Sequence, residues 1–264
     1  MPEEFGGDLA GSVFWGADLS GSRFRDVDLT GVRISHAWLI DVEIDALVDR
    51  LVINGVDVTD HVNEHDPWYP LRTVLRASTP PSFRAGWAAL EAEWAATVDR
   101  ALALPGELVH DSVDGEWSFV ETLRHLVFAM DKWFTAPVLG GAFDPIGLPN
   151  GGSVDFPWPG LDLDRKPSFS DVLTVRANRT ARFREHVAAV EDADLDRSVE
   201  VLENGASSLR QCLQTVLEEE FWHHRYAVRD LDRLEATEVP LANRLRGTAN
   251  ASRVTASDDP EVSA

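Results

Sequence analysis

A glutamate and a histidine one helical turn apart have the types and the spacing that could do chemistry. Glu220 and His224 lie in residues 217–227, and side chains at i and i+4 share one face of a helix. The rest of that face is apolar at a period near 3.6 residues: Leu213, Val216, Leu217, Ala227, Val228, Leu231 and Leu234. Because an unpaired carboxylate is costly to bury, we expect a bound cation or a dedicated partner residue there.

Other polar and aromatic residues flank this pair. Glu219, His223 and Tyr226 could orient the ligands of a metal or carry protons. For Glu219 and His223, the alternative is a salt bridge on the shoulder of the helix. Trp222 and Arg229 point the other way on the helical wheel, so we interpret them as packing and surface residues.

The composition is typical of a globular protein and excludes some partners. The chain has 264 residues, 44% of them hydrophobic, which suffices for one sizeable domain and a small module. A formal net charge of -21 would repel nucleic acid and anionic membranes, so we expect neither as a partner. The absence of a long apolar run or a signal-peptide pattern predicts a cytoplasmic protein. The single Cys212 agrees with a reducing compartment.

A five-residue period runs from residue 8 to about residue 46. Its large apolar positions are Leu9, Phe14, Leu19, Phe24, Leu29, Ile34, Leu39 and Ile44. This pattern resembles the pentapeptide-repeat proteins, whose right-handed quadrilateral β-helix uses four such units per coil, so the repeat implies about two coils. We interpret the repeat as a structural spacer, with mimicry of a DNA duplex as the alternative.

The next stretch predicts an end to the β-helix and then a linker. Asn54-Gly55 lies between two short β-prone runs, which predicts a hairpin that closes the β-helix, so the first domain is expected over residues 1–58. Residues 59–81 are polar and contain prolines, which favours a linker or an irregular arm. His61 and His65 have the i, i+4 spacing of metal ligands, but without an apolar helix face they are better interpreted as exposed.

Four amphipathic patterns within residues 82–234 predict a mainly α protein, an up-down four-helix bundle behind the β-helix. Capping boxes mark the start of the second helix, at Ser118 with Glu121, and of the fourth helix, at Ser208 with Gln211.

Two further segments lack a helical pattern. The connection 140–167 is long and contains the aromatic residues Phe156 and Trp158, which favours a packed lid. Residues 235–264 show no sustained apolar period and are expected to be a mobile tail.

A metal site in a bundle draws its ligands from facing helices, so Glu220 and His224 need a third ligand from elsewhere. His125 on the second predicted helix is our candidate. It lies away from the apolar stripe of that helix, beside Thr122 and Ala129, whose small side chains would leave room for a cleft. A solvated surface histidine is the alternative interpretation.

Two segments resemble the signatures of the DinB/YfiT-like superfamily of four-helix bundles. They are residues 115–127 and the fragment His223-His224-Arg225, and the resemblance covers residues 82–234. Members carry a histidine on the second helix and usually a His-x-x-x-His pair on the last. Here Glu220 takes the earlier position of that pair, as in the related mycothiol-dependent maleylpyruvate isomerases, where two histidines and one glutamate hold zinc. The resemblance therefore implies His125, Glu220 and His224 as metal ligands.

Such a ligand set is typical of a catalytic metal. Two imidazoles and one carboxylate leave an open position on zinc, and nickel or iron would also fit. A thiol or water bound there would lose its proton near neutral pH.

The resemblance implies a metal-dependent S-transferase or isomerase that acts on a small-molecule substrate. Its cosubstrate would be a low-molecular-weight thiol such as mycothiol. The family often dimerises, which implies a homodimer. A metal-binding module without turnover and an acidic scaffold that binds a partner are the alternatives.

Overall fold

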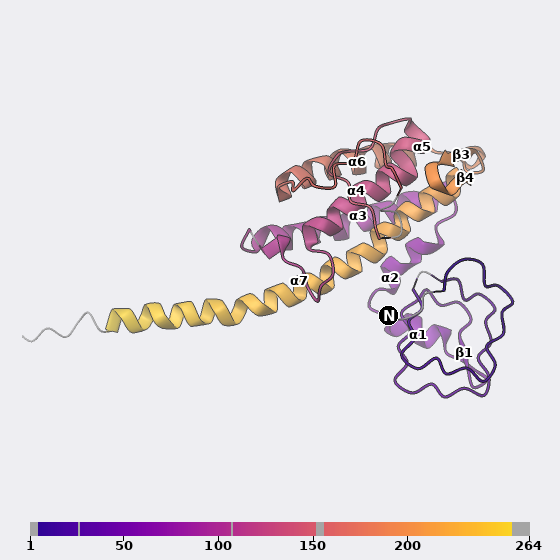
Figure 1. Ribbon diagram of the computed structural model, residues 1–264, viewed down its shortest axis with the longest axis horizontal. Helices are drawn as coiled ribbons and strands as arrows, with labels where there is room; N and C mark the ends of the chain where they lie inside the picture. Colours follow the sequence, from indigo (N-terminus) through magenta and orange to yellow (C-terminus); the bar gives the residue numbers. More distant parts are fainter. Residues whose placement is uncertain (1–4, 26, 107, 152–155, 255–264) are drawn as a thin grey trace, which may run out of the picture. The chain divides into compact units, whose positions relative to one another are not determined.

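The computed structural model describes residues 5–25, 27–106, 108–151 and 156–254, with side chains as far as residue 236. The chain divides into two compact units, Met1–Asp45 and Ala46–Ala264. Its regular structure is mainly helical, as predicted (Figure 1). Within the described ranges, no helix combines the length and the apolar character that crossing a membrane requires.

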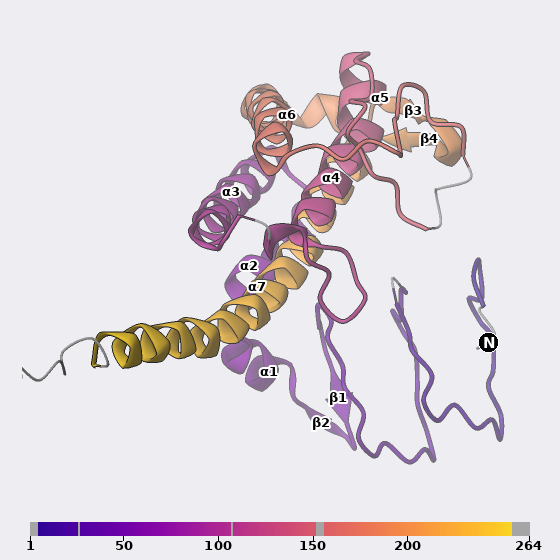
Figure 2. The ribbon, with the colours of Figure 1, turned by 60° about the vertical axis from the view of Figure 1, so that its left-hand side comes forward.

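The first unit is a succession of tight turns (Figure 2). The carbonyl oxygens of Leu9, Leu19 and Leu29 each accept a hydrogen bond of 3.1 Å from the main-chain N–H three residues later. The third residue of each turn is a glycine with φ between 73° and 75°, a region that favours glycine: Gly11, Gly21 and Gly31. The turns therefore follow the period of the sequence repeat, with equivalent turns ten residues apart.

The large apolar residues of this repeat remain partly exposed. Their exposed fractions lie between 46%, for Leu19, and 66%, for Ile34. These positions therefore form no buried core among the described residues of the first unit.

The second unit begins with the predicted hairpin. Strands β1 (Val52–Ile53) and β2 (Val56–Asp57) pair in antiparallel fashion. Asn54 and Gly55 have positive φ values of 52° and 84°, as a tight two-residue hairpin turn requires.

The segment 59–81 differs from the expected linker. It forms α1 (Thr59–His65), α2 (Tyr69–Arg72) and a 3-10 turn, Thr73–Arg76. Leu71 and Val74 are buried in the main core. All three elements are too short to show an apolar period. Tertiary packing holds α2 and the 3-10 turn, whereas α1 has no buried residue.

Four long helices make up most of the second unit: α3 (Pro80–Ala103), α4 (Phe119–Met130), α6 (Phe169–Ala189) and α7 (Leu209–Val254). Both α3 and α4 pack against α6 and against α7 (Figure 2). Helix α7 continues beyond the end expected near residue 234. The last residues of the expected tail, 255–264, lie outside the described part of the chain.

Shorter elements connect these helices. A π-helical turn, Asp131–Thr135, joins α4 to α5 (Ala136–Leu139). The remaining elements are the 3-10 turns Leu108–His110, Asp192–Asp194 and Leu202–Asn204, and the unpredicted strands β3 (Ser198–Val201) and β4 (Gly205–Ser208).

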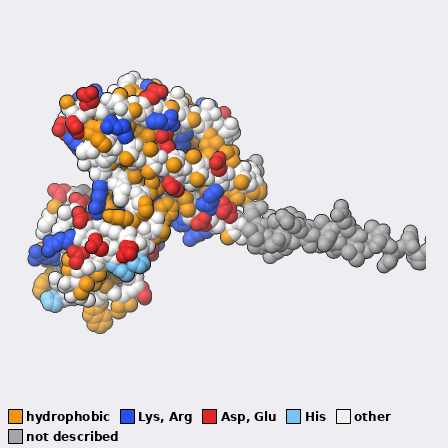
Figure 3. Space-filling view, turned by 180° about the vertical axis from the view of Figure 1, so that it is seen from behind, with side chains coloured by type: hydrophobic (Ala, Val, Ile, Leu, Met, Phe, Trp, Pro, Cys, Tyr) orange, Lys and Arg blue, Asp and Glu red, His pale blue; other side chains and the backbone are white. Residues whose placement is uncertain are grey.

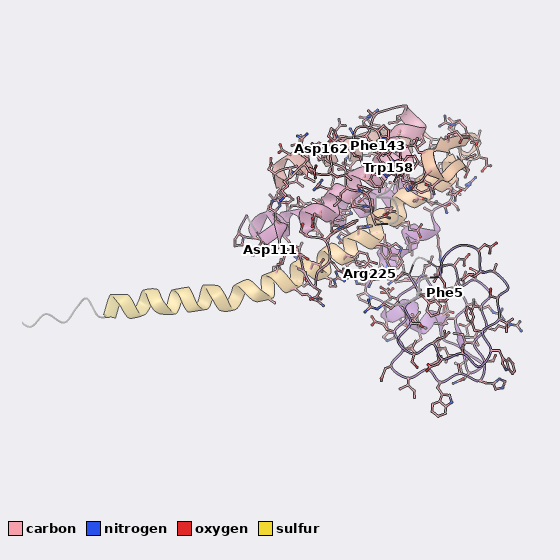
Figure 4. All side chains as sticks on the ribbon, viewed as in Figure 1. Phe5, Asp111, Phe143, Trp158, Asp162 and Arg225 are labelled. Atoms are coloured by element: carbon pink, nitrogen blue, oxygen red, sulfur yellow. The ribbon has the colours of Figure 1, made fainter. Side chains whose placement is uncertain are left out.

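Aromatic residues of the connection between α5 and α6 pack together with a residue of α4, as predicted. Phe143 and Trp158 of this connection, both labelled in Figure 4, are buried against Phe128 of α4. Nε of Arg124 donates to the carbonyl oxygen of Ile146 at 2.8 Å, which fastens the same connection to α4.

Candidate metal centre

His125 projects from α4 and is almost completely buried, with 2% of its surface exposed. Its Nδ1 lies 2.9 Å from the main-chain carbonyl oxygen of Leu148. A carbonyl oxygen can only accept a hydrogen bond, so Nδ1 carries a proton, and in the neutral form of the ring Nε2 then has a lone pair. A metal-binding histidine commonly has its other ring nitrogen held in this way.

The lone pair of His125 faces a glutamate and a histidine of α7. Nε2 of His125 lies 3.3 Å from Oε2 of Glu219, and Nδ1 of His223 lies 3.3 Å from the same oxygen. Nδ1 of His223 also donates to the main-chain carbonyl oxygen of Glu219 at 2.9 Å, which leaves Nε2 of that ring with a lone pair. Each residue offers one ligand atom, and these atoms all lie within 4.8 Å of one another.

The donor atoms fit a divalent cation. A lone pair on His125 that faces a carboxylate oxygen is repelled unless a proton or a cation lies between the two. Zinc binds nitrogen and oxygen at about 2.1 Å, which places two ligand atoms of a tetrahedral site about 3.4 Å apart. The separation of 3.3 Å between Nε2 of His125 and Oε2 of Glu219 agrees with that value.

The surroundings keep two of these donors in the form that binds metal. Burial lowers the pKa of His223 to about 4, and the neighbouring His125 contributes to the shift, so the ring is neutral near pH 7. Burial would raise the pKa of Glu219. Its pKa nevertheless lies below the usual value, because the neighbouring side chains of His125, His223 and Lys132 favour the ionised carboxylate.

The structure does not bring Glu220 and His224, the other two predicted ligands, to His125. Both are buried at 1% exposure, as the apolar stripe predicted. Arg176 of α6 holds Glu220 through two hydrogen bonds, Nη1 to Oε1 at 3.0 Å and Nη2 to Oε2 at 2.5 Å. Nε2 of His224 lies 2.8 Å from the hydroxyl oxygen of Thr97 on α3. The dedicated partner of Glu220 is therefore an arginine.

The donors Glu219 and His223 lie one residue before the predicted ligands Glu220 and His224, and this offset has a geometric cause. Glu219 with His223 and Glu220 with His224 have identical spacing, and successive residues of a helix are rotated by about 100°. The apolar stripe shows which pair is buried most deeply, but it does not show which face of α7 meets His125. The deeper face packs towards α3 and α6, whereas Glu219 and His223, named above only as flanking residues, lie on the shoulder that meets α4.

Aromatic side chains surround the three donors. The ring of Trp117 lies 4.8 Å from the ring of His125 and 6.3 Å from that of His223. Tyr226, expected beside the site, packs edge-on against His223 at 5.9 Å. The sequence analysis missed Trp117 and Arg176; the position of Trp117 directly before the cap of α4 was the one local signal for it.

The fold and the donors define a mainly helical protein with a candidate metal centre between α4 and α7. In a comparison with protein families, residues 89–227 match the DinB superfamily. Residues 8–42 match pentapeptide repeats in 8 copies. The chain therefore belongs to the DinB superfamily, which is generally metal-binding, and carries a pentapeptide segment before it. Searches among curated proteins and solved structures gave no match.

Proposed function

We propose that this protein is a metal-dependent enzyme whose divalent ion is held by His125, Glu219 and His223. One observation carries the proposal: a ligand atom of each of these three residues lies within 4.8 Å of the other two. Zinc suits two imidazoles and one carboxylate best, and nickel or iron would also fit. The site would join two helices of an up-down four-helix bundle, with the pentapeptide segment as a short β-helix before it.

Within this site the chain's own residues would position and shield the reacting groups. The carbonyl oxygen of Leu148 fixes the tautomer of His125, and the main-chain carbonyl of Glu219 fixes that of His223. Trp117 and Tyr226 exclude water from the His223 side. A divalent ion bound there supplies Lewis acidity and lowers the pKa of a thiol or water at its open position.

The reaction class we propose is transfer or isomerisation with a low-molecular-weight thiol such as mycothiol as cosubstrate. The properties of Cys212, the only cysteine of the chain, favour a thiol that comes from outside the protein. Cys212 is buried, and burial raises its pKa to about 11, so it is a poor nucleophile at neutral pH. Reactive sulfur would therefore come from the cosubstrate, whose partner would be a small electrophile.

Metal analysis of single variants tests the ligand assignment. Wild-type protein refolded with zinc is expected to hold one equivalent, and His223→Asn to lose it because a donor is removed. His224→Asn is the matched control, since it changes the adjacent histidine, and it is expected to retain the ion. The reverse result, with metal lost only in His224→Asn, would overturn the assignment and favour Glu220 with His224.

A panel of thiols and electrophiles separates an enzyme from a metal-binding module without turnover. The enzyme is expected to give a rate that requires the metal and disappears in Glu219→Gln. If the metal-loaded wild-type protein gives no rate above the Glu219→Gln background with any pair, the module without turnover is the better description.

A further inference from the structure

The loop before α4 is fastened to α7 beside the candidate metal centre. Nη2 of Arg229 on α7 donates to Oε2 of Glu116 at 2.6 Å, while its Nε donates to Asp230 at 2.7 Å. One helical turn further along, Arg233 makes an ion pair with Asp114. Two arginines on the same side of α7 therefore hold residues 114–116.

The same loop has a tight internal structure. Asp114 and Gly115 have positive φ values of 53° and 77°, which turn the chain sharply. The hydroxyl of Ser112 donates to the carbonyl oxygen of Glu116, so the loop is also closed by its own hydrogen bond. The position of Glu116, and with it that of the next residue, Trp117, is thereby defined.

Trp117 lies over imidazoles that come from two different helices. Its ring plane is inclined by 39° to that of His125 on α4 and by 23° to that of His223 on α7. On the other side of His223, Tyr226 packs edge-on, and the guanidinium of Arg229 lies 5.5 Å from the centre of the Tyr226 ring. Arg229 thus supports both aromatic neighbours of His223, although the sequence favoured a surface role for it.

We propose that Trp117 is a positioning residue of the metal centre and that the ion pair of Arg229 with Glu116 holds it in place. This inference rests on the proposed function. A ring packed on both imidazoles restricts their rotation and keeps water from one side of the donors. Without it, all three donors remain but are less well oriented, so the metal dissociates faster.

Cobalt(II) absorption and zinc release test the proposal. Arg229→Met and Trp117→Leu are each expected to bind one equivalent of cobalt(II), with a changed visible spectrum. Zinc release to a chelator is expected to become about 10-fold faster, which is the lower end of the effect of losing a residue that orients metal ligands. The conservative Trp117→Phe should recover part of both properties, and the charge-reversed Arg229→Glu/Glu116→Arg protein should recover most of them.

The matched control removes an ion pair between other helices. Arg184 of α6 binds both carboxylate oxygens of Glu91 on α3, and Arg184→Met is expected to leave the spectrum and the release rate unchanged. Exposed pairs of this kind contribute about 0–1 kcal/mol, so Arg229→Met should still fold.

Two outcomes contradict the proposal in different ways. Wild-type spectra and release rates in both Arg229→Met and Trp117→Leu would overturn the positioning role and leave the metal centre intact. Failure of the wild-type protein itself to bind cobalt(II) or zinc would instead overturn the proposed function and this inference together.

Discussion

Arg176 binds both carboxylate oxygens of Glu220, and its guanidinium lies 4.7 Å from the centre of the Trp94 ring. The carboxylate could leave this pair only by uncovering a buried cation, which is strongly unfavourable. Glu219, one position earlier, pairs with no arginine in the described part of the chain and faces two imidazoles instead. The difference in role between two adjacent glutamates therefore comes from a residue more than forty positions away.

Removal of Glu220 is expected to destabilise the fold strongly. Glu220→Ala leaves Arg176 buried without its carboxylate, which should cost about 3–5 kcal/mol of unfolding free energy. Urea unfolding of metal-free protein would measure this loss. Glu219→Ala is the control, because its side chain is 25% exposed and makes no arginine pair among the described residues. Equal losses in the two variants would contradict the structural role of Glu220.

His186 gives the fold a sensitivity to acid. Burial lowers its pKa below the ordinary 6.5, with a further contribution from Arg197. The unfolded chain therefore takes up a proton near pH 6.5 while the folded protein resists it, so stability is lost as the pH falls below that value. His186→Leu should lose less unfolding free energy than the wild type between pH 7.5 and pH 5.

The control for this pH experiment is a buried residue that binds no proton. Val187→Ala removes buried apolar surface next to His186 in the sequence, so it should lower the free energy of unfolding by a similar amount at pH 7.5 and at pH 5. If His186→Leu keeps the full wild-type loss, the burial of His186 is not a source of the acid sensitivity.

At the scale of elements, local signals predicted the long helices well. Ser118 and Glu121 exchange the hydrogen bonds of a capping box at 2.9 and 3.2 Å, because each satisfies a main-chain N–H of the other at the start of α4. Such signals reside within four residues of sequence. The hairpin of β3 and β4 has no comparable signal, since Val199 and Val201 are buried with Cys212 of α7, a contact that the local sequence does not show.

Loss of the cap on α4 is expected to destabilise the protein by about 1 kcal/mol. Ser118→Ala removes the oxygen that accepts from the N–H of Glu121, and thermal unfolding measures the effect. Ser168→Ala, at the equivalent box that begins α6, should cost a similar amount. Ser208→Ala should lower the stability by no more than either of these changes. Ser208 accepts a hydrogen bond from the N–H of Gln211, and no return bond from the Gln211 side chain is present among the described residues.

For the molecule as a whole, the sequence predicted the four long helices and one of the three donors of the candidate site, His125. It indicated Glu219 and His223 only as neighbours. The missing information was the rotation of α7, which depends on how Arg176 and Thr97 meet that helix from α6 and α3. The distribution of surface charge does not indicate the site either, since acidic and basic side chains are interspersed on the face shown in Figure 3.

The division into two units predicts that the metal centre does not need the pentapeptide segment. All three donors belong to the unit Ala46–Ala264. A chain that starts at residue 46 is expected to bind one equivalent of zinc with an unchanged melting temperature. Metal analysis and calorimetry would check this. Loss of metal from the shortened chain would show that the pentapeptide segment supports the centre.

Because α7 carries two Glu-x-x-x-His pairs, a shift of its register by one residue would affect the metal donors and the ion pair with Arg176 differently. A deletion of one residue between the start of α7 and Glu218 would move Glu220 and His224 into the places of Glu219 and His223, so the helix would again present a carboxylate and an imidazole to α4. The place of Glu220 would then fall to Phe221, and Arg176 would face a phenyl ring. The shift would thus keep a glutamate and a histidine as donors but remove the ion pair of Arg176 with Glu220. Selection for stability, rather than for metal binding, would therefore oppose the deletion.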